Sequence, residues 1–119
     1  MKAYTDLEQS KKLAEFLSIE SSDMLHCLSF DGVLLATVPK QYSGSFRNQP
    51  ELTIPCWSLT ALLDLLPYPQ LSKDKIGADK IGWMVSVYPD NCRDDSYWHN
   101  NLVDACYDMI LKLHEQKLL

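Results

Sequence analysis

Cysteine and histidine are the residue types in this chain that most readily bind metals or act as nucleophiles. The 119-residue sequence has four cysteines and three histidines: Cys27, Cys56, Cys92, Cys106, His26, His99 and His114. A structural zinc site needs paired ligands at short spacing, such as Cys-x-x-Cys, so that one loop presents two donors. No pair here has that spacing. The sequence therefore predicts no metal site.

Residues 90–95 concentrate carboxylates in a way that superficially matches a calcium-binding loop. An EF-hand needs glycine at the sixth loop position and a bidentate glutamate at the twelfth. Counted from Asp90, these positions hold Asp95 and Asn101. We therefore interpret this segment as a solvated acidic linker.

Cys56 gives the sharpest enzymatic hypothesis. It lies just ahead of an expected helix N-terminus, where the helix dipole lowers the pKa of a thiol. His26, His99 or His114 would then serve as its base. Packing of Cys56 beside Trp57 under that helix is the favoured interpretation. Catalysis by Cys56 with a histidine base is kept as the alternative.

Nucleotide and phosphate cofactors require glycine-rich loops that let the backbone approach a phosphate. The glycines of the chain form no Gly-x-Gly or Walker-type cluster: Gly32, Gly44, Gly77 and Gly82. A Gly-x-Ser-x-Gly nucleophile elbow is also missing from the sequence. We therefore expect no cofactor.

The composition is that of a single globular domain spanning residues 1–119. Hydrophobic residues make up 46% of the chain and charged residues 23%, which is close to globular averages. The net charge of −5 argues against nucleic acid, because Lys and Arg are needed to neutralise its phosphates. The same charge works against attraction to anionic lipid. Neither nucleic acid nor a membrane is an expected partner.

The N-terminus and the hydropathy pattern favour the cytoplasm. Residues 1–8 lack the continuous apolar stretch of a signal peptide. No apolar run approaches the roughly 20 residues needed to cross a bilayer. Because disulfides rarely persist in a reducing cytosol, the cysteines are expected to be free and to behave as small apolar residues.

Apolar residues at helical spacing predict three helices. Thr5 and Glu8 form the pattern of a capping box ahead of a helix over residues 6–17. A more apolar helix is expected over residues 57–66, and a third begins after Asn101 as N-cap. The core face of the third helix comprises Leu102, Cys106, Met109, Ile110 and Leu113.

Three strands are expected between these helices. Asp31-Gly32 separates the apolar residues 24–30 from residues 33–38, which is the signal of a two-residue hairpin turn. Residues 80–88 alternate in the manner of a third strand. The intervening polar or turn-rich segments are expected to be loops: residues 41–50 and 68–78. The predicted fold is α+β, with three helices packed on a small, mainly antiparallel sheet in the order α-β-β-α-β-α.

Several segments together form a recognisable fingerprint: residues 7–13 (LEQSKKL), 22–24 (SDM), 56–67 (CWSLTALLDLLP) and 104–119. On these segments the chain resembles a family of small uncharacterised proteins encoded in gut bacteria and their phages or mobile elements. Family members typically carry Asn-Pro where this chain has Asn101-Leu102, a change that keeps the N-cap and loses the preset φ of proline. The resemblance implies an association with a mobile element or phage. It implies no activity and no catalytic residues.

A second apolar stripe on the last helix exceeds what the core of a monomer requires. It lies around the helix from the core face and comprises Tyr107, Leu111, His114 and Leu118. A helix that is apolar on two sides is either enclosed within its domain or presents one side to a partner. Both interpretations stay open, and the second predicts self-association or the docking of another protein.

Trp98 is a second candidate anchor for a partner, because aromatic side chains are common at interfaces. Its neighbours Tyr97 and His99 make the spot strongly aromatic. Pinning of this loop onto its own domain is the favoured interpretation. The sequence as a whole predicts a non-enzymatic accessory or protein-interaction module, and a small cysteine-dependent enzyme using Cys56 is the alternative.

Overall fold

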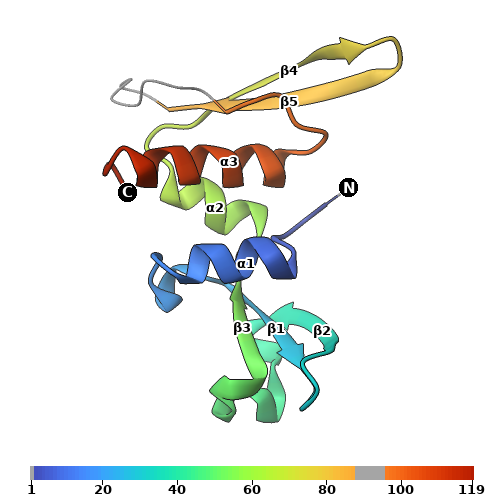
Figure 1. The fold of residues 1–119 in the computed structure, drawn as a ribbon, viewed down its shortest axis with the longest axis vertical. Coiled ribbons are helices and arrows are strands. Elements are labelled where there is room, and N and C mark those ends of the chain that lie inside the picture. The colour runs from blue at the N-terminus through green and yellow to red at the C-terminus, as the bar shows by residue number, and fades with distance from the viewer. Residues whose placement is uncertain (1, 88–95) are drawn as a thin grey trace. The chain divides into compact units, whose positions relative to one another are not determined.

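The computed structural model describes residues 2–87 and 96–119 and divides the chain into two compact units (Figure 1). The N-terminal unit is Tyr4–Ala61, and the C-terminal unit is Leu62–Leu119 together with Met1–Ala3. The boundary between them falls within the second helix. The expectation that residues 1–119 form one domain stays a prediction.

Helices and strands follow one another in the predicted α-β-β-α-β-α order, with two strands added. The elements are α1 (Leu7–Ala14), β1 (Met24–Leu28), β2 (Leu34–Pro39), β3 (Thr53–Cys56), α2 (Leu59–Leu65), β4 (Gln70–Gly77), β5 (Lys80–Ser86) and α3 (Leu102–Glu115). The predicted α+β class is confirmed. The prediction of one sheet was wrong, because β1 and β2 join β3 in one sheet while β5 pairs with β4 in another.

The sheet of the N-terminal unit has the strand order β2-β1-β3, and both pairings are antiparallel. β1 is therefore the central strand, and its residues His26 and Cys27 are buried. α1 packs against β3. This arrangement leaves β2 at one edge of the sheet (Figure 1).

α1 is capped one residue later than the sequence pattern predicts. The Gln9 backbone N–H donates to Asp6 Oδ1 at 2.8 Å, and the Gln9 side chain accepts from the Asp6 N–H at 3.2 Å. The predicted box of Thr5 and Glu8 was therefore wrong. Thr5 is buried, which removes its hydroxyl from the exposed helix end. α1 also stops at Ala14, short of the expected residue 17.

The hairpin turn between β1 and β2 is one residue longer than predicted. The Ser29 N–H donates to the Val33 carbonyl at 2.8 Å, so residues 30–32 form the loop. Gly32 has a φ of 81°, the left-handed conformation that closes three-residue hairpin loops. A register shift beside Leu28 then creates a bulge on β2 at Leu35.

Both segments expected to be loops contain regular structure. Most of residues 41–50 lie within three short 3-10 turns: Lys40–Tyr42, Gly44–Asn48 and Pro50–Leu52. Residues 68–78 contain β4, which pairs along its length with β5. β4 is polar and exposed on both faces, so it lacks the alternation that reveals a half-buried strand.

In the C-terminal unit, α3 packs against β5 (Figure 1). The predicted N-cap of α3 is confirmed, because the Asp104 N–H donates to Asn101 Oδ1 at 2.8 Å. Its predicted core face is largely confirmed, although Leu102 is only half-buried. The buried apolar residues of this unit include Val85, Val87, Val103, Ala105, Cys106, Met109, Ile110 and Leu113.

Candidate functional site

The N-terminal unit encloses a network of polar side chains that links α1, β1 and β3. Four of its members are almost completely buried: Thr5, Ser10, His26 and Cys56. His26 is its centre, because each ring nitrogen has a hydroxyl partner. Nε2 lies 2.9 Å from Ser10 Oγ, and Nδ1 lies 2.7 Å from Thr37 Oγ1.

Thr5 connects the imidazole to the thiol. His26 Nε2 lies 3.1 Å from the Thr5 carbonyl oxygen, and the Cys56 thiol donates to the same oxygen at 3.4 Å. The Thr5 hydroxyl lies 2.8 Å from Ser10 Oγ and accepts from the Trp57 N–H at 3.1 Å. The network thereby fixes the segment before α1 to the end of β3.

The environment of Cys56 opposes nucleophilic catalysis. Cys56 is 0% exposed and ends β3, three positions before α2 begins, so it does not adjoin a helix N-terminus as predicted. Burial raises the pKa of its thiol, an effect that hydrogen bonds from Thr5 and Ser10 oppose. Because the thiolate is the reactive form, a raised pKa and full burial both disfavour attack on a substrate.

His26 is an equally poor general base. Burial lowers its pKa, against smaller opposing effects of backbone hydrogen bonds and of the Asp6 charge. Its hydrogen bonds go to hydroxyls and a carbonyl within the network, and no bond joins it directly to Cys56. The network instead satisfies the hydrogen-bonding capacity of buried polar groups. Fully satisfied networks of this kind make a protein interior more rigid.

The predicted stripe on α3 is divided by the structure between half-buried and exposed side chains. Tyr107 and Leu111 are half-buried, whereas His114 and Leu118 are exposed. His114 Nδ1 lies 3.1 Å from the Leu119 carbonyl oxygen. The stripe is therefore partly covered by the chain, and its role as a docking surface stays a prediction.

The aromatic segment around Trp98 is held against α3 by its neighbours. The Tyr97 N–H donates to Asp108 Oδ2 at 2.8 Å, and His99 Nε2 lies 3.0 Å from the same oxygen. Lys112 Nζ sits 3.8 Å from the centre of the Tyr97 ring. Trp98 itself is 41% exposed. These contacts support the interpretation that the loop is fixed to its own fold.

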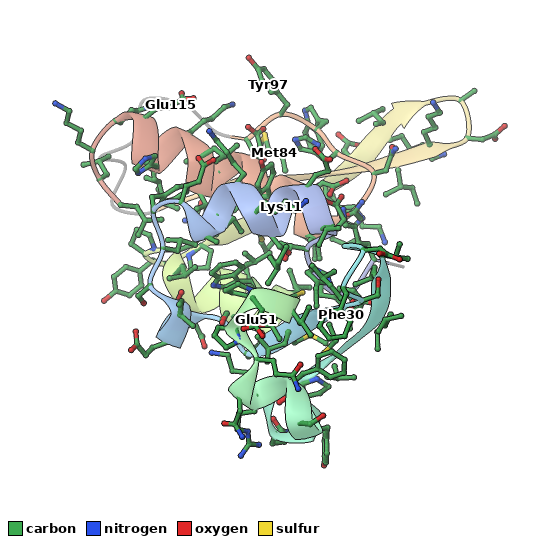
Figure 2. The ribbon with its side chains drawn as sticks, turned by 60° about the horizontal axis from the view of Figure 1, so that its bottom comes forward. Lys11, Phe30, Glu51, Met84, Tyr97 and Glu115 are labelled. Carbon is green, nitrogen blue, oxygen red and sulfur yellow. The ribbon has the colours of Figure 1, made fainter. Side chains whose placement is uncertain are left out.

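Several exposed apolar side chains lie close together in sequence on the β1–β2 hairpin, which the sequence pattern assigned to the sheet. We call it the hairpin patch: Phe30 (91% exposed), Val33 (60%), Leu34 (43%) and Leu35 (60%). Figure 2 labels Phe30 on this hairpin. The sequence did contain a signal, since residues 33–36 are continuously apolar, but periodicity alone does not say which face of a strand is covered.

Comparison of the chain with protein-family models, curated proteins and solved structures gave no match.

Within residues 2–87 and 96–119, no three His, Cys, Asp or Glu side chains gather closely enough to hold a metal ion. In the same ranges no helix has the length and apolar character to cross a membrane. Cys92 and the acidic residues 90–95 lie outside the described residues.

Proposed function

We propose that this protein is a non-enzymatic accessory and protein-interaction module that assembles with a second copy through the hairpin patch and the edge of β2. The observation that carries the proposal is a sheet edge whose neighbouring apolar side chains are exposed together. Contiguous exposed apolar side chains are characteristic of surfaces that bind a protein or a membrane.

The backbone of β2 provides the first half of the interface. In the part of the chain that the structure describes, β2 pairs with β1 alone, so one row of its N–H and C=O groups faces away from the sheet. Such a row is a template for another strand. Pro39 and the bulge at Leu35 mark the two ends of the stretch available for pairing.

The charge pattern of the hairpin favours a second copy as the partner. Residues 34–38 carry no ionisable side chain, so an antiparallel pair of β2 strands places no like charges opposite one another. The twofold arrangement brings the Asp31 end of one strand beside the Lys40 end of the other. Opposite charges at both ends favour this register, and the contact closes as an isologous dimer.

The cysteine-dependent enzyme is the weaker reading of the geometry. Its nucleophile and its base are both buried within one hydrogen-bonded network. Substrate would have to open the N-terminal unit to reach the Cys56 thiol. The resemblance to small proteins of gut bacteria and their phages agrees with an accessory role.

Sedimentation velocity over a range of protein concentrations tests the proposal. The unaltered chain is expected to form a dimer that dissociates on dilution. Leu35→Lys is expected to stay monomeric, because it places two ammonium groups in the interface. Ile81→Lys is the matched control, since Ile81 is 49% exposed on β5 in the other unit.

Leu111→Asp separates the hairpin patch from the α3 stripe. The proposal expects this variant to dimerise as the unaltered chain does. A strict monomer at every concentration would overturn the proposal, and so would a dimer that Leu35→Lys leaves intact. A dimer abolished by Leu111→Asp but not by Leu35→Lys would move the interface to the α3 stripe.

A further inference from the structure

A pocket of about 430 Å³ lies within the N-terminal unit, away from the hairpin turn. Its walls come from β1, β3, the 3-10 turn at Ile19–Ser21 and the turns that follow β2. Pockets of roughly 300–1,000 Å³ are typical of small-molecule sites. The volume alone does not identify a ligand, so the class of ligand is inferred from the chemistry of the residues that line the pocket.

The walls are mainly apolar. Ile19, Leu25, Pro50 and Pro55 contribute hydrocarbon surface from four separate segments of the chain. Pro55 also belongs to β3, where its ring lies beside Leu25 across the β1–β3 pairing. An apolar lining with a few placed polar groups is the usual composition of a ligand pocket.

Both charged side chains that line the pocket are cations, Lys40 and Arg47. Among the residues that the structure describes, no carboxylate lines it, although acidic residues outnumber basic ones in the chain, 16 to 11. Within the described ranges neither cation belongs to an ion pair. The charged side chains that line the pocket are thus positive, although the protein as a whole is acidic.

Each cation is positioned by one hydrogen bond and keeps further donors. Lys40 Nζ donates to the Ile19 carbonyl at 2.8 Å, and Arg47 Nη2 donates to the Gln41 carbonyl at 3.4 Å. An ammonium has three N–H donors and a guanidinium five. The remaining donors are available to an acceptor on a ligand.

The backbone that carries Lys40 is fixed before any ligand arrives. The Lys40 N–H donates to the Asp23 carbonyl at 3.1 Å, and the buried Ser43 hydroxyl donates to the Lys40 carbonyl at 2.8 Å. Preorganised donors lower the cost of ordering a site on binding. The pocket therefore has shape, an apolar interior and two positioned cations.

We propose that this pocket binds a small amphipathic carboxylate, with its hydrocarbon or aromatic body against the proline and aliphatic walls and its carboxylate between Lys40 and Arg47. A guanidinium matches the two oxygens of a carboxylate in geometry, and charge-assisted hydrogen bonds are stronger than neutral ones. The inference is independent of dimer formation, which involves the hairpin patch.

Isothermal titration calorimetry with three probes tests this site on the full chain. Octanoate supplies both the body and the charge, octanamide keeps the body without the charge, and acetate keeps the charge without the body. Octanoate is expected to bind at least about tenfold more tightly than either control, because octanamide loses the charge-assisted hydrogen bonds and acetate loses the burial of the hydrocarbon body.

Two variants place the binding in this pocket. Arg47→Gln is expected to weaken octanoate binding by about tenfold while leaving the affinity for octanamide unchanged. Ile19→Trp fills the pocket from an exposed wall position and is expected to abolish binding of both. Lys75→Gln, on exposed β4, is the control for lost charge and is expected to change neither affinity.

Three results of these titrations would overturn the proposal of a carboxylate site. Equal affinity for octanoate and octanamide would show that the cations do not recognise the ligand. Undetectable octanoate binding, or binding that Ile19→Trp leaves intact, would remove the site altogether. The dimer measured by sedimentation would be unaffected by any of these results, so the two proposals fail separately.

Discussion

Two groups of side chains within the N-terminal unit are placed opposite to their usual preference. Thr5, Ser10 and His26 are polar and almost completely buried, whereas Phe30 and Leu35 are apolar and mostly exposed. Buried polar groups and exposed apolar groups are the informative departures from ordinary burial. The first group is hydrogen-bonded throughout, and the second has no such internal explanation.

The potentially reactive side chains and the exposed apolar side chains therefore occupy separate places in this unit. Side chains able to do chemistry, such as Cys56 and His26, lie in the interior, and unreactive apolar side chains form the exposed hairpin patch proposed as the interface. Removal of an interior group should therefore cost stability, while removal of a hairpin group should cost association.

His26→Ala should produce the largest loss of stability. It removes the partner of the buried Ser10 hydroxyl and of the half-buried Thr37 hydroxyl, and leaves a cavity. We expect the free energy of unfolding to fall by about 3 kcal/mol, measured by urea denaturation. His114→Ala, at an exposed position, is the control and should change it by less than about 0.5 kcal/mol. A small effect at His26 would mean that the network contributes little.

The pH dependence of stability should reveal the same histidine. Because burial lowers the pKa of His26 below its ordinary value of 6.5, the unfolded chain binds a proton more readily than the folded one in the acidic range. The stabilisation is complete above pH 6.5 and is lost as the pH falls toward the folded pKa. Urea midpoints should therefore decrease between pH 7.5 and pH 5.

A matched variant assigns that pH dependence. His26→Gln keeps hydrogen-bonding capacity but has no group that titrates in this range. Its unfolding free energy should fall less between pH 7.5 and pH 5 than that of the unaltered chain. An identical decrease in both proteins would assign the effect to other groups.

The two alternative caps of α1 should differ in the size of their effect. Asp6→Ala removes the acceptor for the Gln9 N–H and is expected to lower the free energy of unfolding by about 1 kcal/mol. Glu8→Ala tests the cap predicted from the sequence and should cost only a few tenths of that. Thermal unfolding followed by circular dichroism measures both. A larger loss of stability for Glu8→Ala than for Asp6→Ala would favour the capping box of Thr5 and Glu8.

Leu35→Lys should have the smallest effect on the stability of the monomer. Leu35 lies at a bulge and is 60% exposed, so we expect a change within about 0.5 kcal/mol. The measurement is urea denaturation at a concentration where the unaltered chain is monomeric. A loss of several kcal/mol would show that the hairpin patch belongs to the core after all.

Local patterns predicted α3 well and α1 less well. The N-cap of α3 and most of its core face depend on residues within a few positions of one another, and the structure confirms both. At α1 the sequence offered two adjacent N-cap residues, Thr5 and Asp6. The choice depends on the hydrogen bond that the buried Thr5 hydroxyl accepts from the Trp57 N–H, a contact that no local pattern reveals.

The buried network and the sheet division could not be predicted for a related reason. Cys56 and Thr5 are separated by 51 positions in the chain, and their meeting depends on β3, a four-residue strand containing Pro55. β4 was missed because its exposed polar residues resemble a loop. The sequence predicted the hairpin. Whether another element covers its apolar side chains depends on tertiary packing, which the local sequence does not reveal.

The most direct test of the central claim is alkylation of Cys56 in the folded protein. Folded and urea-unfolded samples are treated with iodoacetamide at neutral pH, and the modified peptide is quantified by mass spectrometry. Because the thiol is fully buried and its pKa is raised by burial, Cys56 should react in the unfolded sample only. Rapid modification of Cys56 in the folded protein would contradict the account, since it would show an accessible, activated thiol.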